Sequence, residues 1–170
     1  GRIYRAVSTT KGPAGYGGPY EDVGVILEPG PDSQPWEGHQ GVAAFFPYRV
    51  REKWYGFYCT AYSGGKPELW PSGLAWAPRL AGPWTRCGLD INPCTCIQPR
   101  FCENPVGTRS PDGRYVAVFD GGPAYLGVPG HFAYTTSEDG VHWTPAVYVD
   151  LESKVEKWWT VMRTPLCLLP

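Results

Sequence analysis

The chain has 170 residues, of which 42% are hydrophobic, enough to form a sizeable core in one domain. Its 15 basic and 16 acidic residues give a net charge of −1, and no run of Lys and Arg occurs. The composition therefore argues against a partner that is a nucleic acid or an acidic membrane surface, and no apolar run is long enough to cross a bilayer.

Short runs of strand-forming residues alternate with turns along the whole chain, and no stretch has a sustained helical period. The 8 Trp and 11 Tyr favour pleated sheets, while the 22 Gly and 19 Pro indicate turns between short strands. The segments that we expect to form strands are, in chain order, Ile3–Ser8, Asp22–Leu27, Gly41–Val50, Lys53–Tyr62, Gly73–Ala77, Trp84–Ile91, Pro105–Ser110, Arg114–Asp120, His131–Thr136, Trp143–Asp150 and Trp159–Leu169.

The order of these strands restarts at a nearly constant spacing. The second strands of two copies begin at Trp54 and Tyr115, and the third strands centre near Ala75 and Ala133, so both recur after roughly 60 residues. Recurrence of one four-stranded unit is typical of propeller blades. An irregular β-sandwich would explain the strands but not the restart. Three copies also share a phrase between their third and fourth strands: Gly18-Pro19-Tyr20, Gly82-Pro83-Trp84 and Gly140-Val141-His142-Trp143.

We therefore expect an all-β fold, a β-propeller fragment of four-stranded antiparallel blades with about two complete blades and parts of two others. In this interpretation, residues 1–170 form a single partial domain. Residues 1–30 are the end of one blade, 36–92 and 101–151 are complete blades, and 158–170 begin the next. The chain starts without Met and ends abruptly at Pro170, which is consistent with a fragment.

Six cysteines are present, and four of them fall between positions 87 and 102. Their spacing is not a standard zinc pattern, so we expect no metal site. Buried free thiols and disulfides are both consistent with the pattern. If disulfides form, at least one should join two of the four clustered residues, Cys87, Cys94, Cys96 and Cys102, which would fit a protein outside the cytoplasm.

Several phrases resemble the five-bladed propeller glycosidases, a group that includes arabinanases, β-xylosidases, invertases and levansucrases. Leu74–Pro78 followed by Gly82–Thr85 is similar to the turn after the third strand in these enzymes, and Thr136–Trp143 is similar to a variant of it. Trp159–Pro165 resembles the first strand of a further blade. Sialidases have a related box that is one residue longer. The resemblance implies a propeller enzyme that acts on a carbohydrate.

The resemblance also suggests catalytic residues. Glu103, in Glu103-Asn104-Pro105, is at the position where these enzymes have an acidic residue before a Pro, and we expect it to be the general acid. Glycoside hydrolysis requires two carboxyl groups, one of them protonated. Glu37 is the candidate for the second, although the family uses Asp as the base. Alternatively, Glu103 only accepts hydrogen bonds from turn amides.

Further residues near the expected entrances of the inner strands are candidates for substrate binding. His39 and Gln40 stand where the family has an Asp, and both could equally be ordinary loop residues. Asp120 precedes Gly-Gly, so it could instead make a turn. Trp side chains can stack on sugar rings or pack between blades, and Arg163 could pair with Glu103. The complete set is Trp36, His39, Gln40, Asn104, Asp120, Trp158 and Arg163.

The sequence thus predicts acid-assisted cleavage of an extracellular or periplasmic oligo- or polysaccharide, without a cofactor, together with further blades as structural partners. The rival hypothesis is a non-catalytic propeller that binds glycans or proteins, because propellers serve many functions. We also expect Glu103, Arg163 and the segment from Glu37 to Gln40 to converge on one pocket.

Overall fold

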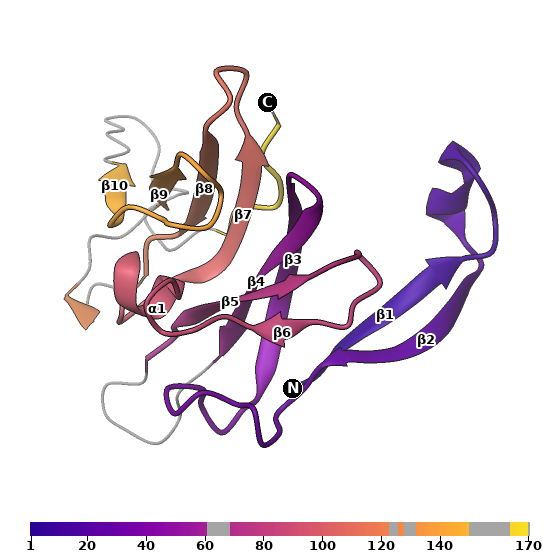
Figure 1. Cartoon of the computed structure of the whole chain (residues 1–170), viewed down its shortest axis with the longest axis horizontal. Helices are drawn as coiled ribbons and strands as arrows, with labels where there is room; N and C mark the ends of the chain where they lie inside the picture. Colours follow the sequence, from indigo (N-terminus) through magenta and orange to yellow (C-terminus); the bar gives the residue numbers. More distant parts are fainter. Residues whose placement is uncertain (61–68, 123–125, 128–131, 150–163, 170) are drawn as a thin grey trace, which may run out of the picture.

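A computed structural model describes residues 1–60, 69–122, 126–127, 132–149 and 164–169 (Figure 1). In these residues the chain is almost entirely β, with one short 3₁₀ turn at Pro13–Gly17 and one four-residue helix, α1, at Pro93–Cys96. The strands are β1 (Ile3–Ser8), β2 (Tyr20–Leu27), β3 (Val42–Val50), β4 (Lys53–Thr60), β5 (Ser72–Ala77), β6 (Thr85–Arg86), β7 (Glu103–Arg109), β8 (Tyr115–Asp120), β9 (Phe132–Ser137) and β10 (Val147–Val149).

The strands form two consecutive four-stranded antiparallel sheets, each with neighbouring strands in chain order. β3-β4-β5-β6 is the first sheet and β7-β8-β9-β10 is the second, and β1 and β2 pair separately. This is the arrangement of two neighbouring blades in a partial β-propeller. The predicted fold class is therefore confirmed, whereas the five-bladed ring and the division into blade fragments at the two ends stay predictions.

The two sheets have the same register. Arg49 pairs with Trp54 in the first sheet, and Arg109 pairs with Tyr115 at the equivalent place in the second. Between the second and third strands, Tyr58 pairs with Gly73, and Phe119 pairs with Ala133. The residue that corresponds to Ala133 is therefore Gly73, and not Ala75 as the spacing of the sequence repeat predicts.

Both inner strands contain an irregularity at the same place. β3 is shifted between Ala43 and Phe46, and β7 is shifted between Glu103 and Val106. Within these bulges Ala44 has φ 48° and Asn104 has φ 51°, the left-handed region that residues other than Gly seldom adopt. A bulge turns side chains away from their regular direction and is common beside active sites. The repeated unit therefore includes the bulge in its inner strand as well as the strands themselves.

The outer strands are shorter than the sequence predicts. Trp84–Ile91 was expected as a strand, but only Thr85 and Arg86 pair, because the chain then turns into the segment before α1. Likewise, of the described residues 143–149, only Val147–Val149 pair, and Asp150 lies outside the described residues. Of the strand expected over Trp159–Leu169, residues 159–163 are outside the described residues, and 164–169 form no strand.

The main core lies between the two four-stranded sheets, as predicted for blades packed face to face. Phe57 and Leu74 of the first sheet pack with Phe119 and Ala133 of the second, and all four are fully buried. Tyr48 links the sheets through polar atoms as well, since its hydroxyl donates to the Gly140 carbonyl at 2.8 Å.

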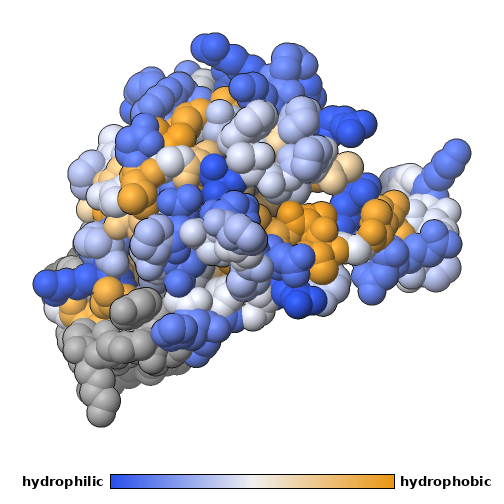
Figure 2. Space-filling view, turned by 60° about the horizontal axis from the view of Figure 1, so that its bottom comes forward, coloured by the Kyte–Doolittle hydropathy of each residue, from blue (hydrophilic) through white to orange (hydrophobic). Residues whose placement is uncertain are grey.

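The β1–β2 hairpin projects away from the two sheets (Figure 1). Its base, at Ile3 and Leu27, packs against the outer face of the first sheet. The projecting part has apolar side chains in contact with solvent, and Figure 2 shows orange surface on this arm. The exposed apolar residues here include Val7, Val23 and Val25.

All six cysteines are free thiols, so the predicted disulfide among residues 87–102 does not form. Cys102 is fully buried in the core between the sheets, and Cys96 forms a hydrogen bond with the Asn92 carbonyl at 3.2 Å. Packing, rather than covalent crosslinks, holds this segment in place. The inference of an extracytoplasmic location therefore gains no support from disulfides. No helix in the described part of the chain is both long and apolar enough to cross a membrane.

Candidate active site

Two carboxyl groups face each other across the first two strands of the second sheet. Glu103 begins β7, Asp120 ends β8, and the two residues are direct partners in the antiparallel register. Side chains of directly opposed residues project from the same face of a sheet, with Cβ atoms about 5 Å apart. The fold therefore brings together a predicted catalytic residue and a predicted binding residue that lie at opposite ends of a hairpin in the sequence.

Asp120 is fully buried, and only one of its two carboxyl oxygens has hydrogen-bond partners among the described residues. Its Oδ2 accepts hydrogen bonds from Asn104 Nδ2 at 3.0 Å and from Thr164 Oγ1 at 3.2 Å. Its Oδ1 is buried and has no hydrogen-bond partner among the described residues. Buried polar atoms are nearly always paired, so an unpartnered carboxyl oxygen beside a second carboxyl is unusual.

Both carboxyl groups have raised pKa values. Burial, followed by the charge of Asp120, raises the pKa of Glu103 to about 7. Burial raises the pKa of Asp120 to about 6, although its hydrogen bonds from Asn104 and Thr164 lower it in part. No ion pair links either carboxyl to a Lys, Arg or His of the described residues. Near neutral pH, the pair can therefore hold a proton that Glu103, which is half-buried, can donate.

Asn104 makes two hydrogen bonds next to the carboxyl pair. Its left-handed backbone lets its N–H donate to Cys59 Sγ at 3.2 Å, while its side-chain amide donates to Asp120. Cys59 is a neutral thiol here, since burial raises its pKa to about 12. The Asn104 side chain, predicted to bind substrate, thus bonds to Asp120 and holds that carboxyl in place.

Glu37 lies in a different environment. Arg86 donates to both of its oxygens, from Nε at 2.6 Å and from Nη2 at 3.0 Å, and the Tyr58 hydroxyl donates at 2.8 Å. The Arg86 and Glu37 side chains are only 3% and 4% exposed. A carboxylate that is neutralised in this bidentate way is suited to hold a loop in place.

Glu37 and Glu103 lie on opposite sides of the first sheet, Glu37 on the loop before β3 and Glu103 on β7 of the second sheet. Tyr58, which contacts Glu37, packs toward β1 and β2, whereas Cys59, which contacts Asn104, points the other way because successive side chains of a strand alternate. The expected convergence of Glu37 and Glu103 in one pocket is therefore not what the structure has. Its third member, Arg163, lies outside the described residues.

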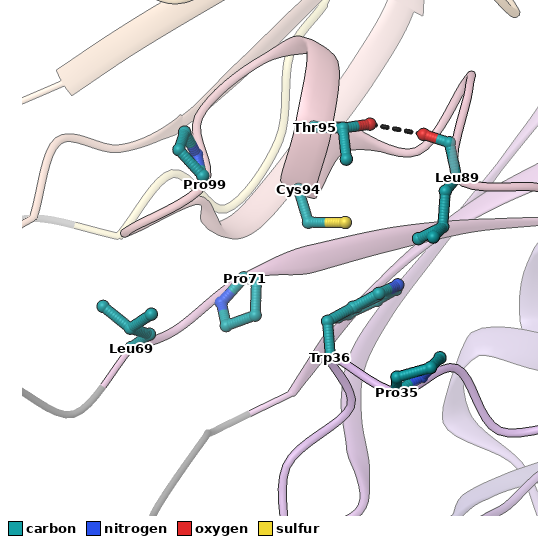
Figure 3. Close-up of a pocket in the computed structure, with 8 residues that line it drawn as sticks. All are labelled: Pro35, Trp36, Leu69, Pro71, Leu89, Cys94, Thr95 and Pro99. Carbon is teal, nitrogen blue, oxygen red and sulfur yellow. Dashed lines mark hydrogen bonds between the residues drawn. The ribbon is translucent and has the colours of Figure 1, made fainter. Parts of the chain in front are cut away.

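The remaining candidates are dispersed. His39 and Gln40 are on the loop before β3, and both are exposed. Trp36 stacks on Tyr58 with ring centroids 5.9 Å apart, and it lines an apolar pocket of about 460 Å³ (Figure 3). Trp158, like Arg163, falls outside the described residues. His, Cys, Asp and Glu in the described ranges do not gather in any group of three that could hold a metal ion.

The sequence interpretation missed Arg86 and Tyr58, which hold Glu37. Arg86 was placed in an expected edge strand without a role. A signal was present, because Arg between the apolar Trp84 and Cys87 is in a segment that should be buried, and a buried Arg almost always has an acidic partner. The identity of that partner, 49 positions away, depends on the tertiary structure.

No family model matches the chain, and no curated protein matches it either. Among solved structures, the chain is similar to one described as a thermostable family-43 glycoside hydrolase, with 22% identity and a TM-score of 0.47. The match covers 73% of this chain and 41% of that chain. A likeness of this extent does not establish an activity.

Proposed function

We propose that the chain belongs to an enzyme that hydrolyses a glycosidic bond in an oligo- or polysaccharide, with Glu103 as the general acid. The supporting observation is the Glu103–Asp120 pair, in which a half-buried carboxyl has a pKa near neutrality and the described residues provide no cation for it. A general acid works best when its pKa is close to the working pH. Perturbed carboxyl pairs of this kind occur mainly at functional sites.

In the proposed reaction, Glu103 transfers its proton to the glycosidic oxygen as the bond from that oxygen to the anomeric carbon breaks. A water molecule then adds to the anomeric carbon and loses its proton to a second carboxyl group, which acts as the base. Asp120 is fully buried, so it acts through Glu103: its charge keeps the Glu103 proton in place near neutral pH. Asp120 is thus a positioning residue.

Hydrolysis also needs a second carboxyl on the other side of the scissile bond. Asp120 lies beside Glu103 and does not meet this need, and Glu37 is fully engaged by Arg86. Inner strands of a propeller face a common axis. We therefore place the second carboxyl on the inner strand of another blade and assign Glu37 to the support of its loop.

Turnover of a panel of glycosides and polysaccharides by the complete enzyme to which the chain belongs, and by its variants, tests the proposal. Glu103→Gln should reduce turnover by roughly 10²–10⁴-fold, the usual contribution of a general acid, with little change in binding. Glu21→Gln, which changes an exposed carboxylate of β2, is the control and should have no effect. Wild-type turnover by Glu103→Gln would contradict the proposal. Binding without any turnover would favour the rival glycan-binding module.

The pH profile separates the role of Asp120 from a merely structural one. Activity should fall as the pH rises through about 7, because Glu103 must be protonated. In Asp120→Asn the negative charge beside Glu103 is removed, so the pKa of Glu103 should fall and the alkaline limb should move to lower pH. An unmoved limb would show that Asp120 does not act through Glu103.

A further inference from the structure

A pocket lies near the start of β5, and neither Glu103 nor Asp120 lines it. Its volume of about 460 Å³ is in the usual range for pockets that bind small molecules. Three parts of the chain supply its walls: the loop before β3, the segment leading into β5, and the region around α1 (Figure 3). The side chains that form it include Pro35, Trp36, Leu69, Pro71, Leu89 and Cys94.

The walls of this pocket are unsuitable for a charged ligand. Among the described residues that line it, Cys94 is the only titratable one, and burial raises the pKa of its thiol to about 12, which keeps it neutral. A charged group would lose its hydration here without gaining an ionic partner. The lining therefore selects for an uncharged ligand.

The walls also provide few hydrogen bonds for a sugar ring. Thr95 is the one residue with a side-chain hydroxyl on the described part of the lining, and that hydroxyl already donates to the carbonyls of Leu89 and Asn92. A sugar has several hydroxyl groups, each of which would need a partner once it is buried. A mostly apolar ligand is the better match.

Trp36 provides two specific features for such a ligand. One face of its ring stacks on Tyr58, which leaves the other face for a flat group. Its indole Nε1 is buried and has no hydrogen-bond partner among the described residues, and in Figure 3 this nitrogen is at the end of the ring toward Leu89. A buried indole N–H is usually satisfied by an acceptor.

We infer that this pocket binds an uncharged aromatic group with a hydrogen-bond acceptor, such as an aryl ketone or aryl ester, with Trp36 stacking on the ring and Nε1–H donating to the acceptor. The inference does not depend on the proposed hydrolysis. Binding should be the same in Glu103→Gln as in the wild-type chain.

A titration of the full chain with 4-fluoroacetophenone, followed by ¹⁹F NMR, tests this inference. Saturable binding is expected. Trp36→Phe keeps an aromatic ring but removes the N–H, so it should weaken binding by about 2–10-fold, the usual worth of one hydrogen bond. Fluorobenzene, which has no comparable acceptor, should bind more weakly than 4-fluoroacetophenone and should bind equally to both forms.

A matched pair of variants locates the site. Leu89 on the pocket rim and Leu80 in the turn before β6 are similarly exposed, at 44% and 46%. Leu89→Trp should block the pocket and weaken binding at least tenfold, while Leu80→Trp should leave it unchanged. Absence of binding, equal binding by both variants, or tighter binding of benzoate or of a methyl glycoside would overturn the inference.

Discussion

The two four-stranded sheets have the same register, but different residues occupy the positions next to the bulge in the inner strand of each sheet. The positions of Glu103 and Asp120 in the second sheet correspond to Ala43 and Cys59 in the first, since each pair is matched across the first two strands next to the bulge. A blade can therefore form without carboxyl groups at these two positions. Of the two described blades, one has them, without a cation among the described residues, and this supports the proposal that Glu103 acts in chemistry.

A second difference concerns the partners of the buried carboxyl groups beside each sheet. Glu37, on the outer face of the first sheet, is neutralised by Arg86 and also bound by Tyr58. Glu103 and Asp120 instead hold their protons more tightly than usual, because both have raised pKa values. Buried charges that serve stability are paired, whereas unpaired titratable groups are typical of reactive sites. The molecule thus contains both kinds of carboxyl group. Glu37 is bound by Tyr58, and the residue beside Glu103, Asn104, is bound to Cys59, so the two kinds lie near the same end of β4 but on opposite sides of the first sheet.

The largest expected effect comes from breaking the paired carboxylate. Arg86→Met leaves Glu37 buried without its cation, and loss of one partner of a buried pair costs about 3–5 kcal/mol in the free energy of unfolding. Urea unfolding measures this loss. Adding Glu37→Gln should recover much of it. Arg49→Met, which removes an exposed pair with Glu52, is the control and should cost less than about 1 kcal/mol. Equal costs for the two Arg variants would contradict the comparison.

A smaller effect is expected at Gly73, whose counterpart in the second sheet is Ala133. A Cβ at Gly73 would lie 2.3 Å from Tyr58 Cζ and 2.6 Å from Trp36 Cη2, because both rings cover this face of β5. We expect Gly73→Ala to cost about 1–3 kcal/mol by overpacking and to change Trp fluorescence. Gly107→Ala should be tolerated, as its nearest neighbour would be 3.4 Å away. A neutral Gly73→Ala would show that the two rings move apart easily.

The smallest effect is the pH dependence of stability that the carboxyl pair causes. In the folded protein the pKa values of Glu103 and Asp120 are about 7 and 6, above their usual 4.5 and 3.8, so the folded state binds protons more tightly than the unfolded state. The contribution of the pair to stability is therefore fully present below about pH 4 and is lost as the pH rises through 6 to 7.

The double variant Glu103→Gln with Asp120→Asn should lack this loss between about pH 4.5 and 8, a loss that solvent screening of the half-buried Glu103 reduces. Thermal or urea unfolding at several pH values provides the measurement. A second double variant, Glu21→Gln with Asp22→Asn, changes exposed carboxylates of β2 and should keep the wild-type slope. If the first double variant also keeps that slope, the pair does not have raised pKa values.

Much of the fold follows from local sequence. The inner and middle strands of both sheets were predicted closely, since alternating aromatic and small residues between Gly and Pro turns indicate strands directly. The turn at Asp112-Gly113 is present, with the Gly113 N–H donating to the Ser110 carbonyl at 2.9 Å. The outer strands were predicted too long because their ends depend on which neighbour is available for pairing, and propensity does not encode that.

The candidate site could be predicted only in part. Glu103 was identified as a candidate from its place before Asn104-Pro105, and Asp120 was suspected from its place at the end of a strand. Their pairing, the unpartnered Asp120 oxygen and the neutralisation of Glu37 by Arg86 all depend on contacts between residues far apart in the chain. Sequence spacing cannot reveal such contacts.

The sequence by itself determined that this protein is built from a repeated four-stranded unit, because side-chain alternation and turn chemistry are local and recur with a period of about 60 residues. Tertiary structure alone decided which carboxyl groups hold a proton near neutral pH. Burial and the nearest charge decide this, and both depend on where each side chain lies in the folded chain.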